Sequence, residues 1–190
     1  MDRLILALAA LTGLAAQSGP EALIERYGAG GVSTSPDGHW RVVAMPNRSD
    51  DPYARATLEG PGVKRGIDYL RMLRVFWPRD GRHLILLHIA LDGEVLTVHS
   101  LASRDAVAPD TIERGIERQM RQLSPSLEDV GRQEIALGLA GTTPCVLVSQ
   151  SGTPKGHRTG SFVTRNRAFR LDLERGRAIP VPACPGAVLA

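Results

Sequence analysis

Aromatic residues are scarce in this 190-residue chain, where Phe, Trp and Tyr together make up 4%. A hydrophobic core must therefore come mainly from Leu, Ile, Val and Ala. Lysine is nearly absent too, because only Lys64 and Lys155 among the 23 basic residues are not arginine. The net charge is only +3. We therefore favour the base composition of the source genome as the cause of the arginine excess; the alternative is an anionic partner.

The chain also lacks the short motifs of several enzyme classes. It has no G-x-S-x-G elbow, no P-loop signature and no dinucleotide-binding fingerprint. "SQSGT" around Ser151 lacks the first glycine of the elbow, and "GAGG" at 28–31 follows no predicted strand. No C-x-x-C pair is present either, so redox catalysis is not expected. We expect no cofactor, and a non-catalytic protein is favoured although an enzyme is not excluded.

An apolar run near the N-terminus indicates export. Residues 4–16, "LILALAALTGLAA", carry no charge, are too short to span a bilayer and have the length of a signal-peptide core. We predict a signal peptide over residues 1–18, with a buried N-terminal helix as the alternative. No other segment reaches transmembrane length. The mature chain, 19–190, is then expected to be a single soluble β-rich domain, periplasmic or secreted.

The predicted export bears on the state of the two cysteines. Cys145 begins the apolar run "CVLVS", and Cys184 lies in the proline-rich tail "PVPACPG". Cysteines in an oxidising compartment commonly pair. We therefore predict a disulfide that holds the C-terminal tail against a strand; the alternative is two unpaired thiols, with Cys145 buried as a small apolar side chain.

Apolar and alternating runs predict a mainly β, antiparallel and hairpin-rich fold. Asp92-Gly93 is a two-residue turn signal between strands predicted over 82–91 and 94–101, and it would place His88 opposite Thr97. The first of these strands carries apolar residues on both faces. We expect it to be covered on both sides.

Two helices are predicted. "DTIERGIERQMRQL" has apolar residues at helical spacing, starts with an Asp110–Glu113 capping box and predicts an amphipathic helix over about 111–123. This helix would lie on a sheet or fill a gap between sheets. A short N-terminal helix is predicted over 18–28, where Pro20 suits the first turn.

Two stretches of the chain have similar sequences. "SPDGHWRVVAM" (35–45) and "WPRDGRHLILLHIALDGEVLTVHSL" (77–101) each pass from a Pro/Asp/Gly turn into an apolar strand, and Gly38 and Gly81 lie 43 residues apart. They resemble blades of TolB-like or WD40-like β-propellers, whose repeats have about this period. "FRLDLERGRAIPV" (169–181) is similar to the outer hairpin of a third blade.

This resemblance implies blade-like segments at about 33–60, 70–102 and 132–182. A closed propeller needs at least four blades, and here the predicted helix also interrupts the repeat. The resemblance therefore implies an incomplete propeller, either an open set of sheets or one completed by another chain or by self-association.

A basic cluster near the C-terminus is a candidate anion- or partner-binding site. Residues 153–177 hold seven basic and two acidic side chains. The candidates are Lys155, Arg158, Arg165, Arg167 and Arg170. For an exported protein, lipid headgroups, anionic envelope polymers or an acidic protein are the expected partners rather than nucleic acid. The alternative is a solvated strand face beside a mobile loop.

His88 and His99 are the candidate metal ligands, because the predicted register places them diagonally on one face of a hairpin. No carboxylate or cysteine of that hairpin joins them, so ordinary half-buried side chains are the favoured alternative.

The sequence as a whole favours an exported, non-catalytic protein- or ligand-binding module of the cell envelope. The alternatives are a periplasmic hydrolase whose site assembles from distant residues and a structural propeller fragment completed by another chain. A deep cleft holding His88 or His99 beside a carboxylate or Ser would favour the enzyme, and a shallow surface of Arg or apolar residues the module. An exposed hydrophobic sheet edge would favour the fragment.

Overall fold

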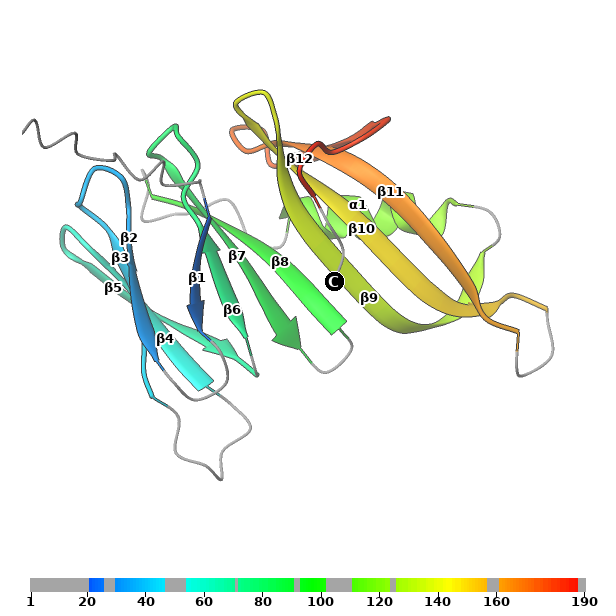
Figure 1. Cartoon of the computed structure of the whole chain (residues 1–190), viewed down its shortest axis with the longest axis horizontal. Helices are drawn as coiled ribbons and strands as arrows, with labels where there is room; N and C mark the ends of the chain where they lie inside the picture. The colour runs from blue at the N-terminus through cyan, green and yellow to red at the C-terminus, as the bar shows by residue number, and fades with distance from the viewer. Residues whose placement is uncertain are drawn as a thin grey trace, which may run out of the picture.

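The structure is a computed structural model that describes residues 21–25, 30–46, 54–70, 72–90, 93–101, 111–123, 126–156 and 161–187. The predicted signal peptide and Arg158 lie outside these ranges. Within them the chain forms three four-stranded antiparallel sheets and one α-helix (Figure 1). The prediction of a mainly β, antiparallel protein with one amphipathic helix is confirmed.

The sheets differ in how the chain builds them. The N-terminal sheet is a meander of β2 (Gly31–Thr34), β3 (Arg41–Ala44), β4 (Ala54–Gly60) and β5 (Val63–Tyr69). The central sheet has the spatial order β1 (Glu21–Glu25), β6 (Leu73–Phe76), β7 (His83–Ala90) and β8 (Gly93–Ser100). The C-terminal sheet is again a meander, of β9 (Leu127–Ala140), β10 (Thr143–Pro154), β11 (Val163–Asp172) and β12 (Arg177–Val181).

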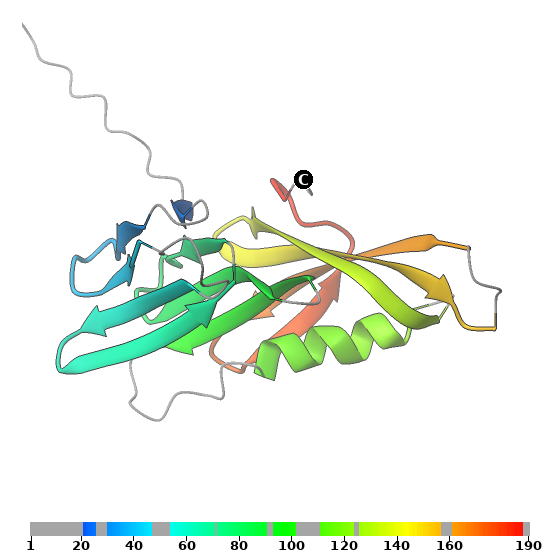
Figure 2. The same cartoon turned by 90° about the horizontal axis from the view of Figure 1, so that it is seen from below.

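The central sheet lies between the other two, and helix α1 (Thr111–Arg121) runs along one face of the C-terminal sheet (Figures 1 and 2). Ile112, Ile116 and Met120, spaced four residues apart, are the buried residues of the helix, as the amphipathic pattern predicts. Gln119 Nε2 donates a 2.8 Å hydrogen bond to the carbonyl oxygen of Ala178 and ties the helix to β12.

The predicted N-terminal helix is wrong where the structure describes it. Glu21–Glu25 form strand β1, which pairs antiparallel with β6 and places Glu21 opposite Phe76. The rest of the predicted helix, residues 18–20 and 26–28, lies outside the described residues. Local helical spacing is a weak preference, and here the backbone hydrogen bonds offered by the edge of β6 override it.

Strand β7 is buried on both faces, as predicted. Leu84 and Leu86 belong to the core between the central and N-terminal sheets, whereas Ile85 and Leu87 belong to the core beneath α1 and the C-terminal sheet. All four side chains are 0% exposed. Each such side chain contributes about 1.5–3 kcal/mol when fully buried, so this strand joins the two cores into one structure.

The predicted register of β7 and β8 is wrong by two residues. His88 pairs with Val95 rather than Thr97, and the last pair is Ala90 with Gly93. Gly93 is needed for another purpose, because a Cβ on it would lie 2.8 Å from the carbonyl oxygen of Gln133 in β9. An even shift leaves every side chain on its face, so the two-sided apolar pattern is unaffected.

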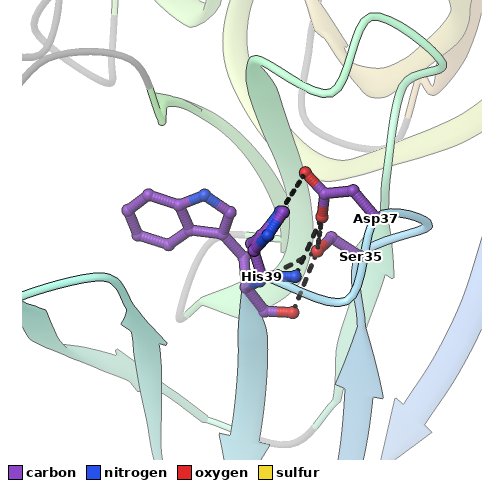
Figure 3. A network of polar contacts seen from close by, with 4 residues as sticks. Ser35, Asp37 and His39 are labelled. Atoms are coloured by element: carbon purple, nitrogen blue, oxygen red, sulfur yellow. Dashed lines mark hydrogen bonds and ion pairs between the residues drawn. The ribbon is translucent and has the colours of Figure 1, made fainter.

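The repeated sequence phrase folds into a repeated turn. Between β2 and β3, Asp37 Oδ1 accepts hydrogen bonds from Ser35 Oγ (2.6 Å) and from the backbone amide of His39 (3.0 Å), while Oδ2 lies 3.2 Å from His39 Nδ1 (Figure 3). Gly38 takes φ 75°, which a residue with a Cβ rarely adopts.

The turn between β6 and β7 has the same design. Asp80 Oδ1 accepts from the backbone amides of Arg82 (2.9 Å) and His83 (3.2 Å), and its Oδ2 lies 2.7 Å from His83 Nδ1. Gly81 takes φ 63°. Each aspartate thus satisfies the amides that follow it. The two stretches share a sequence because they build the same strand-to-strand turn.

The predicted disulfide between Cys145 and Cys184 is confirmed. It holds the C-terminal tail against the C-terminal sheet, where the amide of Leu139 donates to the carbonyl oxygen of Pro185 (3.1 Å). Gly138 leaves room for this tail, since a Cβ there would lie 2.4 Å from Pro185 O. No helix among the described residues is long and apolar enough to cross a membrane.

Candidate functional site

A polar groove lies where α1 ends beside the C-terminal sheet. We call it the α1–β9 groove; its walls are α1, the start of β8 and residues 126–130 at the start of β9. Its volume is about 680 Å³, within the range of about 300–1,000 Å³ that is usual for small-ligand sites. The residues that line it are Gly93, Glu94, Val95, Glu113, Glu117, Arg121, Ser126, Leu127, Glu128, Val130, Gln133, Gln150, Lys155 and Arg165.

Four polar residues from four successive strands are linked by hydrogen bonds in this groove. Arg165 Nη2 in β11 donates to Gln150 Oε1 in β10 (2.9 Å), and Gln150 Nε2 donates to Gln133 Oε1 in β9 (2.7 Å). Gln133 Nε2 in turn donates to the backbone carbonyl of Glu94 in β8 (3.0 Å). We call these residues the groove network. It connects the C-terminal sheet to the central sheet.

The network occupies positions that belong to the core face of the strands. Val146 and Val148 of β10 are core residues, and Gln150 is the next residue on that face. On β11 the core residue Phe169 has the same strand parity as Arg165, which lies directly opposite Gln150. Gln150 and Arg165 are only 6% and 8% exposed. The core face therefore changes from apolar to polar near the C-terminal end of α1.

Arg165 is held from two sides. Besides its bond to Gln150, its Nη1 donates to the carbonyl oxygen of Leu123 (3.2 Å), just beyond α1. Burial lowers the pKa of the guanidinium, but an arginine side chain stays charged in proteins. A fixed cation thus lies in the groove.

Glu94 joins the two sheets through its carboxylate. Its Oε2 accepts a 2.5 Å hydrogen bond from the backbone amide of Ile135, at the edge of β9. A strand edge presents unpaired amides of this kind, and here a side chain supplies the acceptor.

Charges of both signs line the groove. Glu94, Glu113, Glu117 and Glu128 are acidic, and Arg121, Lys155 and Arg165 are basic. Arg121 forms an ion pair of 3.4 Å with Glu117 on the exposed side of α1. The groove can therefore receive a ligand that carries both a positive and a negative group.

The predicted basic cluster is divided by the sheet. Lys155 and Arg165 both line the α1–β9 groove, and Arg167 has the strand parity of Arg165. Arg170 lies opposite Cys145, with the other parity, and lines a second cavity of about 310 Å³ between residues 78–80, 142–144 and 170–174. The structure thus brings together two of the four described candidates.

The two candidate metal ligands lie far apart along their hairpin. His88 pairs with Val95 and His99 with Leu84, an offset of four positions, or about 13 Å of strand. Among the described residues no group of three or more His, Cys, Asp or Glu side chains could hold a metal ion.

Burial determines the titration of both histidines. It lowers the pKa of His88. It also lowers the pKa of His99 to about 4, with smaller contributions from the charges of Arg65 and His88. Nδ1 of each ring is buried without a hydrogen-bond partner among the described residues. Neutral rings fit this layer between two sheets.

Two further histidines lie beside carboxylates, but both belong to the repeated turns. The Asp37 carboxylate accepts hydrogen bonds from Ser35 and from the His39 amide, and these bonds lower the pKa of Asp37 to about 2. Asp80 is likewise occupied by the amides of Arg82 and His83. These carboxylates stabilise turns.

Sequence reasoning identified Lys155 and Arg165 but missed Glu94, Gln133 and Gln150. A signal for the glutamines was present, because each lies two residues from a core residue of its strand, Ile135 and Val148 respectively. A polar residue at an apolar position of a period-two pattern is unusual.

Comparison with protein-family models, with curated proteins and with solved structures finds no match for this chain. The resemblance to TolB-like and WD40-like blades stays a prediction. A function can therefore be proposed only from the geometry of the groove.

Proposed function

We propose that this chain is an exported, non-catalytic binding module and that the α1–β9 groove is its ligand site. The observation that carries the proposal is the groove network, in which Arg165, Gln150, Gln133 and Glu94 are hydrogen-bonded in sequence across four strands. Apolar residues at these positions would continue the core, whereas buried polar groups are costly unless fully paired.

The network gives the groove oriented polar groups before a ligand arrives. Gln150 uses its oxygen for Arg165 and its nitrogen for Gln133, so its amide cannot turn without breaking both bonds. Linked buried groups of this kind are rigid. A ligand then meets side chains whose conformational entropy is already lost, and preorganisation of this kind increases affinity.

Two features support a non-catalytic role. The Asp–His pairs found among the described residues are used in turns, and the two glutamines at the centre of the groove network do not titrate. The module therefore binds its ligand and leaves it chemically unchanged.

The outer face of the N-terminal sheet supports a module rather than a propeller fragment. Glu59 there lies within ion-pair distance of Arg41 and, at 3.1 Å, of Lys64. Val32 and Met45 are also exposed. However, the charged side chains of Glu59, Arg41 and Lys64 suit contact with solvent better than burial against another sheet.

Export is part of the same proposal. The Cys145–Cys184 disulfide fits an oxidising compartment, because cytosolic proteins seldom keep such bonds. The uncharged run at 4–16 fits a signal peptide. The periplasm or the external medium is therefore the proposed location.

A thermal-shift screen of the secreted chain against small polar compounds tests the ligand site. Val130→Arg would fill the groove wall, and Val32→Arg is a matched control on an exposed strand of the N-terminal sheet. A ligand at a hundred times its Kd stabilises by about 2.7 kcal/mol, which raises Tm by roughly 5–10 °C in a chain of this size.

We expect at least one compound to raise the Tm of the wild-type chain and of Val32→Arg but not of Val130→Arg. Equal shifts in all three proteins, or no shift with any compound, would contradict the proposal.

A further inference from the structure

We propose that the ligand of the α1–β9 groove is a short extended peptide that adds to the C-terminal sheet as a fifth strand, along the edge of β9 at residues 127–132. This inference rests on the proposed function and names the class of its ligand.

The first observation is that β9 is an edge strand whose second half is already covered. β9 is the last strand of its sheet and pairs with β10. Along its second half the Ile135 amide is bound by Glu94, the Leu139 amide by Pro185 O, and Gln133 is in close contact with Gly93. Native proteins cover strand edges in this way.

The first half of β9 has no such cover. In the part of the chain that the structure describes, residues 127–132 make no backbone hydrogen bond beyond the ladder with β10. The same residues form one wall of the groove, through Leu127, Glu128 and Val130. The groove therefore runs beside backbone groups that can pair with another extended chain.

The contact of Glu94 with β9 is an example of an oxygen acceptor bound by an amide at this strand edge. Its carboxylate oxygen lies 2.5 Å from the Ile135 amide, at the position that the carbonyl oxygen of a neighbouring strand would take. A peptide in the groove would supply carbonyl acceptors to the next part of the same edge. Glu94 would then mark the place where the added strand ends.

Two irregularities lie in the part of β9 that lines the groove. The register with β10 shifts between Arg132 and Val130 and again between Asp129 and Leu127. Bulges of this kind bend a strand and redirect its side chains, and Val130 and Glu128 both line the groove. Six residues of strand span about 20 Å, so the edge suits a peptide of about four to six residues.

The remaining walls suit the side chains of a peptide of mixed charge. Val95, Leu127 and Val130 offer apolar contact, and Lys155 offers a cation for a carboxylate. Glu128 at the start of β9 offers an acceptor for a basic group. We expect a peptide with one apolar and one acidic residue, or with a free C-terminal carboxylate.

The probe is a library of fluorescein-labelled pentapeptides with free C-termini, titrated with the full secreted chain and followed by fluorescence anisotropy. The best binder is then remade with a methyl group on one backbone nitrogen at a time. Strand pairing uses alternate amides. N-methylation at alternate positions should therefore weaken binding at least tenfold, and methylation between them should change it less than threefold.

Val130→Arg should abolish binding of the parent peptide, whereas Val32→Arg, at another solvent-exposed strand residue (62% exposed against 37% for Val130), should leave it unchanged. A binder that tolerates every N-methyl group would overturn the added strand, and so would a library without any binder.

The inference and the proposed function can fail separately. If small polar compounds stabilise the wild-type chain but not Val130→Arg while no pentapeptide binds, the groove is a ligand site and the peptide is wrong. If neither compounds nor peptides depend on Val130, both are wrong.

Discussion

Arg165 and Gln150 lie directly opposite each other on β11 and β10, and Arg165 Nη2 donates a 2.9 Å hydrogen bond to Gln150 Oε1. Both residues are buried on the face that holds the core further along the same strands. This pair marks the point at which the interface between α1 and the C-terminal sheet stops being apolar and becomes a groove.

Gln150→Leu should lower the free energy of unfolding by about 1–3 kcal/mol, because it leaves the Arg165 and Gln133 groups facing an apolar side chain. Urea unfolding followed by circular dichroism measures this loss. The double variant Gln150→Leu with Arg165→Met should recover most of it, since paired apolar replacements are often neutral. If the double variant instead loses as much stability as Gln150→Leu and Arg165→Met lose separately when added together, the linked network is contradicted.

The stability of the chain should fall as the pH falls from about 6.5 to about 4. His99 has a pKa of about 4 in the folded chain against an ordinary 6.5, so in this range the unfolded chain binds the extra proton. The contribution of His99 is fully present above pH 6.5 and is lost towards pH 4, and it amounts to roughly 3 kcal/mol. The lowered pKa of His88 acts in the same direction.

Denaturant unfolding of wild-type and His99→Leu chains at a series of pH values measures this effect. His99→Leu should flatten the dependence between pH 6.5 and 4. An unaltered slope in His99→Leu would rule out His99 as its source.

Gly138→Ala should destabilise the chain by about 1–3 kcal/mol, because its new Cβ would meet Pro185 O at 2.4 Å and Cys184 Sγ at 2.9 Å. Gly66→Ala is the matched control, since a Cβ there has nothing within 4 Å and the residue also lies in a strand. Thermal unfolding compares the two. A loss at Gly66 as large as the loss at Gly138 would show that the tail does not press on β9.

Removing the disulfide with Cys145→Ser and Cys184→Ser should cost about 2–4 kcal/mol, the usual range for a bond that closes a loop of this order. The two cysteines are 39 residues apart in the sequence. Urea unfolding of the double variant and of the oxidised wild-type chain gives the difference. Equal stability would mean that the tail is held by its other contacts alone.

The parts of the fold that depend on local pattern could be predicted from the sequence. Alternating apolar residues placed Leu84 to Leu87 on two buried faces, and the spacing of Ile112, Ile116 and Met120 located α1. Contacts between distant segments decided the rest. The pairing of β1 with β6 replaced a predicted helix, and Gly93, predicted to be in the turn, pairs with Ala90 and lies close to Gln133 of β9.

Only some residues of the candidate site could be predicted from the sequence, for the same reason. The basic cluster predicted Lys155 and Arg165 correctly as neighbours, but it also included Arg170, which lies on the other face of β11. Glu94 and Gln133, 39 residues apart in the chain, meet only because the start of β8 lies against β9. No local pattern contains that contact.

Lysine labelling can locate the ligand most directly, because the chain has only two lysines. Lys155 lines the α1–β9 groove, and Lys64 is exposed on the N-terminal sheet. The purified chain is acetylated with and without a compound or peptide that raises its Tm, and the two sites are quantified by mass spectrometry. We expect acetylation of Lys155 to slow several-fold while that of Lys64 is unchanged. Equal rates at Lys155 with and without the bound compound would contradict a ligand site in the groove.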